Sequence, residues 1–411
     1  MSANIFTWTR RYALMLVTII FSAASVWAQV AVRGETVYTM AGPAIRDGVV
    51  LVRDGRVERV GPSSAVQIPA GYKTLSARVV TPGLIDAHST IGLSGYLNQP
   101  HDQMQLERSG PIQPELRATD AYNGRERLIE WVRGFGVTTV HTGHGPGSLI
   151  SGQTMIVKTL SGEVEQAVIV PAAMIAATVG DAGLAPAGRA PGTHSKEIAM
   201  LRTELLKAQE YDRKQASAKE DQKGSRDLRS EALARVLKGE VPLLVTVQRA
   251  HNIVAVLRLA KEFNIRVILD GAAEAYMVAD QIKAAGVSVI IHPTMARAAG
   301  EAENLSMETA ARLRKAGVPL ALQSGFEAYV PKTRIVLFEA GVAAANGLTF
   351  DEALSLITID AARLLGISAR VGSIEAGKDA DLALYDGDPF EYTTHCTMTL
   401  INGKVISDEP H

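Results

Sequence analysis

The chain has one cysteine, Cys396, among its 411 residues, so no disulfide can form within it. Its stability must come from buried apolar surface, which a chain of this length can supply with one large and one smaller domain. An excess of charge is also absent, because 42 Lys and Arg residues stand against 43 Asp and Glu residues. This balance excludes the basic footprint of a nucleic-acid-binding protein, and no nucleic-acid partner is expected.

Long apolar runs are lacking beyond residues 1–28. Within that segment, Arg10 and Arg11 precede an apolar core at residues 12–24, and Val-Trp-Ala at 26–28 resembles a small-residue cleavage site. This order is typical of a secretory signal peptide, so we expect export to the periplasm or the extracellular space. An anchor that is not cleaved is the alternative, although the apolar core is short for a membrane span. After removal of the signal, no membrane association is expected.

Both ends of the remaining chain are rich in short alternating strands broken by turns. Residues 29–78 contain a hairpin signal at Asp54-Gly55, and residues 366–411 contain another at Asn402-Gly403. The matching pattern predicts that the two ends combine into one small β-sandwich.

The middle of the chain, residues 79–365, alternates apolar β-rich runs with helical segments. Continuous apolar strands separated by helices favour a parallel sheet covered on both faces. The number of units predicts an α/β fold with a (β/α)₈ TIM-type barrel. A densely charged stretch at about residues 196–240 is interpreted as a solvated helical insertion.

Three segments are distinctive when taken together. They are Pro-Gly-Leu-Ile-Asp-Ala-His at residues 82–88, Gly-Val-Thr-Thr-Val at 136–140, and Gly-Ser-Ile-Glu-Ala-Gly-Lys-Asp-Ala-Asp-Leu at 372–382. With them the chain resembles the imidazolonepropionase-like branch of the amidohydrolase superfamily. The resemblance implies the barrel fold and hydrolysis of a carbon–nitrogen bond by metal-activated water.

The resemblance also implies where metal ligands should stand, and most of those positions have changed. His88 keeps the first histidine of strand one, but Thr90 replaces the second. Thr246, Gly271 and Gly325 stand where relatives have ligands on strands five, six and eight. A hydroxyl is a poor zinc ligand, and glycine offers no side chain at all. A zinc complex is worth roughly 10 kcal/mol over about four ligands, so one imidazole should not retain the ion. The standard binuclear mechanism is therefore not expected.

Other histidines offer a way to rebuild a site. His141 and His144 follow predicted strand two, and His292 ends predicted strand seven. Because barrel sites are built from strand ends on one face, we expect His88, His141 and His144 to converge there as catalytic or metal-binding groups. With His292 they would hold one divalent metal such as Zn²⁺. The alternative is that these imidazoles bond to neighbouring loops and no metal binds.

Four further residues are candidates for substrate binding. Lys158 lies on a segment that relatives also have, where a buried lysine can form a carbamate bridge or pair with a carboxylate. His194 directly precedes the charged insertion, and Glu274 and Tyr276 keep their places in the family pattern.

Two interpretations remain open from the sequence. The first is an exported hydrolase that acts on a small cyclic amide or a dipeptide-like compound through a non-standard site. The second is an inactive pseudoenzyme that binds a small ligand or pairs with an active relative. A homo-oligomer is compatible with both.

Overall fold

The structure is a computed structural model, and it describes residues 29–97, 99–217, 224–294, 296–325 and 335–411. The segment interpreted as a signal peptide, residues 1–28, lies outside the described residues. Among the helices that are described, none is long and apolar enough to cross a membrane.

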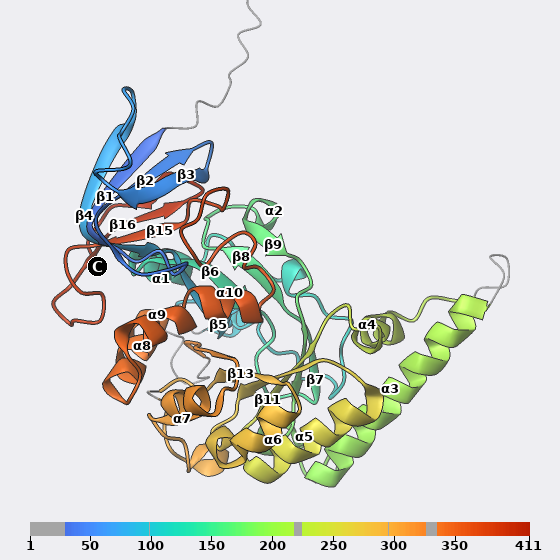
Figure 1. The fold of residues 1–411 in the computed structure, drawn as a ribbon. Helices are drawn as coiled ribbons and strands as arrows, with labels where there is room; N and C mark the ends of the chain where they lie inside the picture. The colour runs from blue at the N-terminus through green and yellow to red at the C-terminus, as the bar shows by residue number, and fades with distance from the viewer. Residues whose placement is uncertain (1–28, 98, 218–223, 295, 326–334) are drawn as a thin grey trace, which may run out of the picture.

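The two chain ends lie in one seven-stranded sheet with the order β17-β16-β15-β4-β1-β2-β3 (Figure 1). Its strands are β1 (Val30–Val37), β2 (Ile45–Arg53), β3 (Arg56–Pro62), β4 (Lys73–Pro82), β15 (Leu382–Tyr385), β16 (Cys396–Ile401) and β17 (Lys404–Ser407). β4 pairs in parallel with β1 and antiparallel with β15, which joins the ends. Because β4 bridges both ends, the hydrogen bonds join the two chain ends in one continuous sheet. Residues of both ends share one apolar core, and the predicted β-sandwich stays a prediction.

The middle of the chain forms a TIM-barrel-like domain. Its strands are β5 (Leu84–Ser89), β6 (Val137–Thr142), β7 (Ile150–Gln153), β8 (Met155–Lys158), β9 (Val168–Val170), β10 (Ile175–Thr178), β11 (Leu243–Val247), β12 (Val267–Gly271), β13 (Ser288–Ile291) and β14 (Leu320–Ala321). They pair in the orders β14-β13-β12-β11-β10-β7 and β5-β6-β8-β9. The amide of Ala87 donates to Leu322 at 3.1 Å, which places β5 beside the chain after β14.

One strand position of the barrel is antiparallel to its neighbours. β8 pairs antiparallel with β6, and β7 pairs antiparallel with β10. β7 and β8 are separated only by Thr154, so they act as one bent strand between β6 and β10. Residues 143–149 join β6 to β7 without a crossover helix, and such a short connection produces an antiparallel pair. The expectation of an entirely parallel barrel was therefore wrong here.

Helices cover the outside of the strands (Figure 1). They are α1 (Arg127–Gly134), α2 (Val164–Ala167), α3 (His194–Ser217), α4 (Leu228–Leu237), α5 (Ala250–Phe263), α6 (Ala279–Ala284), α7 (Thr309–Ala316), α8 (Val336–Ala345), α9 (Phe350–Leu356) and α10 (Ile359–Leu364). The charged stretch forms α3 and α4, which pack against each other. α3 buries Leu201, Leu205 and Ala208 along one side. The two helices thus form an arm with a narrow apolar face.

Candidate functional site

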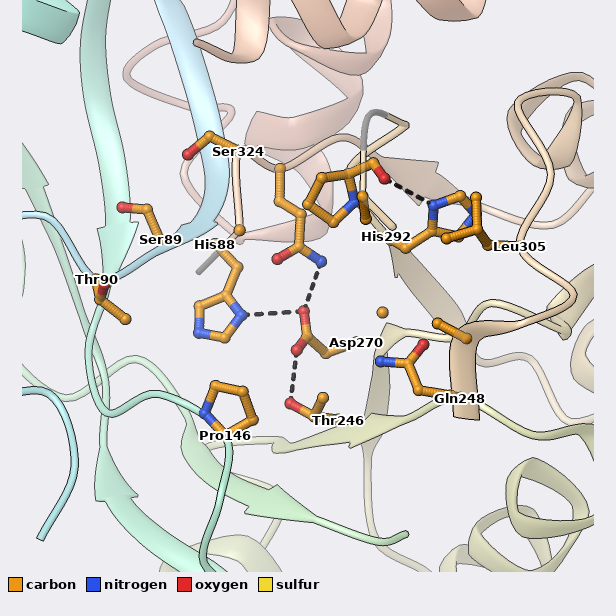
Figure 2. A pocket seen from close by; sticks show the side chains of 16 residues that line it. His88, Ser89, Thr90, Pro146, Thr246, Gln248, Asp270, His292, Leu305 and Ser324 are labelled. Carbon is orange, nitrogen blue, oxygen red and sulfur yellow. Dashed lines mark hydrogen bonds and ion pairs between the residues drawn. The ribbon is translucent and has the colours of Figure 1, made fainter. Parts of the chain in front are cut away.

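A small cavity of about 150 Å³ opens where β5, β11, β12 and β13 end (Figure 2). In barrels of this type, the carboxyl ends of the strands carry the functional side chains. The polar residues that line this cavity are His88, Ser89, Thr90, Thr246, Gln248, Asp270, His292, Gln323 and Ser324. The chemistry of the site must come mainly from this set.

The centre of the site is an ion pair between His88 on β5 and Asp270 on β12. His88 Nδ1 lies 3.0 Å from Asp270 Oδ1, and both side chains are buried. Two further donors hold the carboxylate: Thr246 Oγ1 donates to Oδ2 at 2.6 Å, and Gln323 Nε2 donates to Oδ1 at 2.8 Å. Since a carboxylate only accepts hydrogen bonds, Nδ1 of His88 carries the proton.

The other ring nitrogen of His88 is left free for chemistry. His88 Nε2 is buried and has no hydrogen-bond partner within the described part of the chain. Figure 2 shows this nitrogen on the side of the ring away from Asp270. A buried polar atom without a partner is costly, so its presence beside a cavity points to a bound group.

The electrostatics of the pair favour charge on both members. Burial lowers the pKa of His88, but the charge of Asp270, its hydrogen bond and the charge of Asp86 together raise the pKa above its ordinary value. Burial raises the pKa of Asp270, but His88, Thr246 and Gln323 lower it overall. Asp270 therefore stays ionised and stabilises an imidazolium at His88.

Asp86 holds the backbone at His88 in place through hydrogen bonds. Its Oδ1 accepts from the amides of Ser324 at 3.0 Å and of His88 at 3.3 Å, and its Oδ2 bonds to the Ser324 hydroxyl. Burial raises the pKa of this carboxyl to about 6, although these hydrogen bonds oppose the shift. Asp86 thus ties β5 to the segment after β14 and fixes the backbone that presents His88.

Asp270 is a site residue that the sequence analysis missed. Gly271 ends β12 and lines the cavity as expected, but the side chain that faces the cavity belongs to the residue before it. Asp270 is the register partner of Thr246 on β11, so the two side chains share one level of the barrel. A charged residue that directly follows Val-Ile-Leu in a buried strand was the available signal.

His141 and His144 do not join His88 in a metal site. His141 Nδ1 bonds to the carbonyl of Ala87 and its Nε2 to Thr154 Oγ1, both at 2.7 Å. Its ring centre lies 5.4 Å from that of His88, and burial, then the His88 charge, lower its pKa to about 3. His141 is thus a structural link between β5, β6 and Thr154, and its nitrogens are taken.

His144 is buried beside Gly152, where an added Cβ would lie 2.3 Å from the His144 ring. Neither ring nitrogen has a hydrogen-bond partner within the described residues, and burial lowers the pKa to about 4. Neither His141 nor His144 lines the cavity. The expected convergence of three histidines was therefore wrong.

His292 lines the cavity, but its nitrogens are also occupied. Nδ1 donates to the carbonyl of Pro293 at 3.0 Å, and Nε2 lies 3.3 Å from Thr309 Oγ1. Burial lowers the pKa of the ring. His292 is a neutral wall residue in this arrangement and is not a metal ligand.

The four expected substrate-binding residues lie outside the cavity lining. Lys158 Nζ donates to Asp379 at 2.8 Å, to Asp381 at 3.0 Å and to Asn402, where the barrel meets the end sheet. This buried network uses the ammonium for structure, so neither a carbamate nor a substrate contact fits Lys158.

Glu274, Tyr276 and His194 also contact protein groups. Glu274 accepts from the Ala250 amide at the start of α5 at 2.7 Å and from Asn304 at 2.8 Å. Tyr276 donates to the Asn304 carbonyl at 3.0 Å. His194 begins α3 and lies 3.2 Å from Asp181. None of the three reaches the His88 cavity.

Comparison with known proteins identifies the class. Residues 90–407 match the amidohydrolase family, and the chain belongs to that family. The imidazolonepropionase of Stenotrophomonas maltophilia is 26% identical over 399 residues, which cover 89% of this chain and 92% of that protein. The imidazolonepropionase of Caulobacter vibrioides is 25% identical over 383 residues, covering 83% and 88%. The crystal structure of an amidohydrolase from Thermotoga maritima superposes with a TM-score of 0.88 at 27% identity, covering 92% of this chain and all of that one. The resemblance to the imidazolonepropionase-like branch is thus confirmed, and it supports a carbon–nitrogen hydrolase.

Amidohydrolases usually bind a divalent metal, but the residues around this cavity do not fit one. Zinc takes three or four protein donors. Among the ring nitrogens of His88 and His292, only His88 Nε2 lacks a hydrogen-bond partner within the described residues. Both oxygens of Asp270 already accept hydrogen bonds. Across the described ranges, no three His, Cys, Asp or Glu donors around this cavity lie within 4.8 Å of one another. Hydrogen-bond donors, and not a metal cation, therefore stabilise the negative charge of Asp270.

Proposed function

We propose that this protein is an exported hydrolase that opens the carbon–nitrogen bond of a small cyclic amide or a dipeptide-like compound. The buried, unpartnered Nε2 of His88 beside the cavity carries this proposal, because Asp270 fixes one proton on Nδ1, so the neutral form of His88 has its lone pair on Nε2. The reaction class rests on membership in the amidohydrolase family. In this proposal the His88–Asp270 pair replaces the binuclear metal centre.

The pair can perform general acid–base hydrolysis. His88 Nε2 takes a proton from water, and the resulting hydroxide attacks the carbonyl carbon. When the carbon–nitrogen bond breaks, the imidazolium returns the proton to the leaving nitrogen. Asp270 stays ionised throughout and stabilises the imidazolium. Gln248 accepts from the Ala273 amide at 3.1 Å through its side-chain oxygen, so its NH₂ group is left to polarise the substrate carbonyl.

The size of the cavity limits the substrate. A cavity of about 150 Å³ is the size that holds a single ring such as benzene. A single small ring fits this space, and a large peptide does not. The walls supply both amide and hydroxyl groups, which suits a substrate that has a carbonyl and an N–H.

The test is hydrolysis by protein freed of metal with a chelator. A panel of small cyclic amides, 4-imidazolone-5-propionate and proline-containing dipeptides would be followed by mass spectrometry. We expect turnover that survives chelation and falls by about 10²–10⁴-fold in His88→Ala and Asp270→Asn. His395→Ala is the matched control, since His395 forms an exposed pair with Asp386. Turnover that requires added metal would contradict the proposal.

A pseudoenzyme is the second candidate, and the closed hydrogen-bond network favours it. Thr246 and Gln323 satisfy Asp270, and Thr90 bonds to Ser94 at 2.7 Å. These residues need no ion to be satisfied. If no substrate of the panel is hydrolysed while calorimetry detects a compound whose binding requires His88, the protein is a ligand-binding member of the family. Its partner would then be a small molecule, an active relative or a second copy of this chain.

Export is tested on the intact chain. A C-terminally tagged form should fractionate outside the cytoplasm, and its N-terminal sequence should begin at Gln29 if the signal is cleaved. Recovery of the full-length chain in the cytoplasm would contradict export, and full-length chain in the membrane would support the uncleaved anchor.

A further inference from the structure

A second group of ionisable side chains lies away from His88, at the rim of the barrel. Asp181 stands in the short helix η3 (Asp181–Gly183) after β10, and Glu301 stands in η6 (Gly300–Ala302) after β13. His194 is the first residue of α3. One donor atom from each of these three side chains lies within 4.8 Å of the others, and His194 Nε2 is 3.2 Å from Asp181 Oδ1. Three separate elements thus bring one imidazole and two carboxylates together.

Glu301 holds an oxygen that lacks a partner. Its Oε2 accepts from the Asp181 amide at 2.7 Å. Its Oε1 has essentially no exposed surface and makes no hydrogen bond within the described ranges, although the Ala182 amide also faces this carboxylate. A Cβ added to Gly180 would lie 2.6 Å from both oxygens, so glycine at 180 makes room for this carboxylate. An enclosed carboxylate oxygen without a donor costs free energy unless a cation or a proton compensates it.

A third acidic side chain, Glu197, lies beneath the cluster. Its side chain is fully buried. Its two oxygens share a single donor, the amide of Gly180, at 3.2 Å each. A carboxylate can accept about four hydrogen bonds, so Glu197 is also poorly satisfied. Acidic side chains therefore surround the Gly180-Asp181 segment, and the imidazole of His194 lies beside them.

We propose that Asp181, His194 and Glu301 bind one Zn²⁺ ion at the barrel rim, with water completing the coordination. Two ligands at about 2.1 Å from zinc and at a tetrahedral angle lie roughly 3.4 Å apart, which matches the Asp181–His194 separation. A set of one imidazole and two carboxylates suits zinc, whereas Mg²⁺ and Ca²⁺ prefer oxygen donors alone. His251 stacks on His194 with ring centres 6.1 Å apart and helps to hold the ligand ring.

The ion would connect the loop after β13, which lines the His88 cavity, to the segment after β10. Ala302, which adjoins Glu301, and Leu305 both line the His88 cavity. Zinc would therefore hold the segment after β13 against the segment after β10 and fix one wall of that cavity. None of the three ligands lines the His88 cavity, so zinc binding at the rim is measured separately from the reaction at His88.

The test is calorimetric titration of the untagged, chelator-treated full chain with ZnCl₂. We expect one equivalent to bind, with affinity reduced by at least about tenfold in His194→Ala, Asp181→Asn and Glu301→Gln. Glu303→Gln and His395→Ala are matched controls, since Glu303 pairs with Arg249 and His395 with Asp386 on the surface. Both should bind as the parent does. Titration with Co²⁺, followed by visible absorption, gives a second measurement that reports the coordination geometry of the bound ion.

Three results would overturn the proposal. The first is the absence of saturable zinc binding to the folded chain, with folding checked by circular dichroism. The second is an equal loss of affinity in Glu303→Gln and Glu301→Gln. The third is loss of the ion in His88→Ala with retention in His194→Ala, which would place the metal in the central cavity.

Discussion

At the scale of single residues, the His88–Asp270 pair links activity to pH. The net effect of its surroundings raises the pKa of His88, and a general base must be neutral. We therefore expect kcat/KM to rise with pH through this raised pKa. Asp270→Asn removes the negative charge, so the pKa of His88 falls and the acidic limb moves to lower pH, with a reduced plateau. The pH–rate profiles of the two forms check this. Asp386→Asn, beside exposed His395, should leave the profile in place; an unmoved profile in Asp270→Asn would rule out His88 as the base.

Asp86 should make the stability depend on pH in the opposite direction from an ordinary ion-paired acid. Burial raises its pKa from 3.8 to about 6, so the folded state binds the proton more tightly than the unfolded chain. Its contribution is fully present below pH 3.8 and is lost as the pH rises through about 6, which amounts to about 3 kcal/mol from the shift.

Asp86→Asn keeps an oxygen for the two backbone donors and has no charge to bury. The free energy of unfolding in urea should therefore lose this decline between pH 4 and 6. The exposed variant Asp120→Asn is the control and should retain the decline. A decline of unchanged size in Asp86→Asn would assign it to other groups.

Single site residues were predicted correctly from the sequence where a motif identifies the end of a strand. The prediction failed where the side of the strand on which a side chain lies had to be inferred. His88 lies in the cavity because its motif ends a strand at the barrel mouth. The family pattern placed a metal ligand at Gly271 on β12. Strand pairing instead puts Asp270 of the same strand level with Thr246. One residue reverses the facing in a strand, and only the hydrogen-bond register decides it.

At the scale of elements, Lys158 connects β8 to the end sheet. Its side chain is 3% exposed, and its carboxylate partners Asp379 and Asp381 are 8% and 4% exposed. Lys158→Met would leave Asp381 without its ammonium, and breaking a buried pair on one side costs about 3–5 kcal/mol. Urea unfolding should show a loss of this size. Lys207→Met removes an exposed pair with Glu204 and should cost under about 1 kcal/mol. Similar losses in both would mean that the network contributes little.

The same scale shows why the topology could be predicted only in part. Apolar strands that alternate with helices correctly indicated a TIM-barrel-like domain, and hairpin signals at Asp54-Gly55 and Asn402-Gly403 mark real turns, with positive φ at all four residues. Strand direction across residues 143–149 was not visible, because an apolar run has the same period in a parallel and an antiparallel pair. That β4 bridges both chain ends depends on pairing over more than 300 residues, which local patterns do not record.

At the scale of the whole molecule, zinc should stabilise the folded chain because it binds the assembled rim and not the separated loops. With free zinc at about 100 times the dissociation constant, mass action adds about 2.7 kcal/mol to the free energy of unfolding. Thermal unfolding should therefore move upward on addition of ZnCl₂, and amide exchange should slow in residues 180–183 and 300–302. His88→Ala should keep both effects, since its imidazole lies outside the rim, whereas His194→Ala should lose both. A zinc-dependent shift that persists in His194→Ala would show that the ion stabilises the chain from another place.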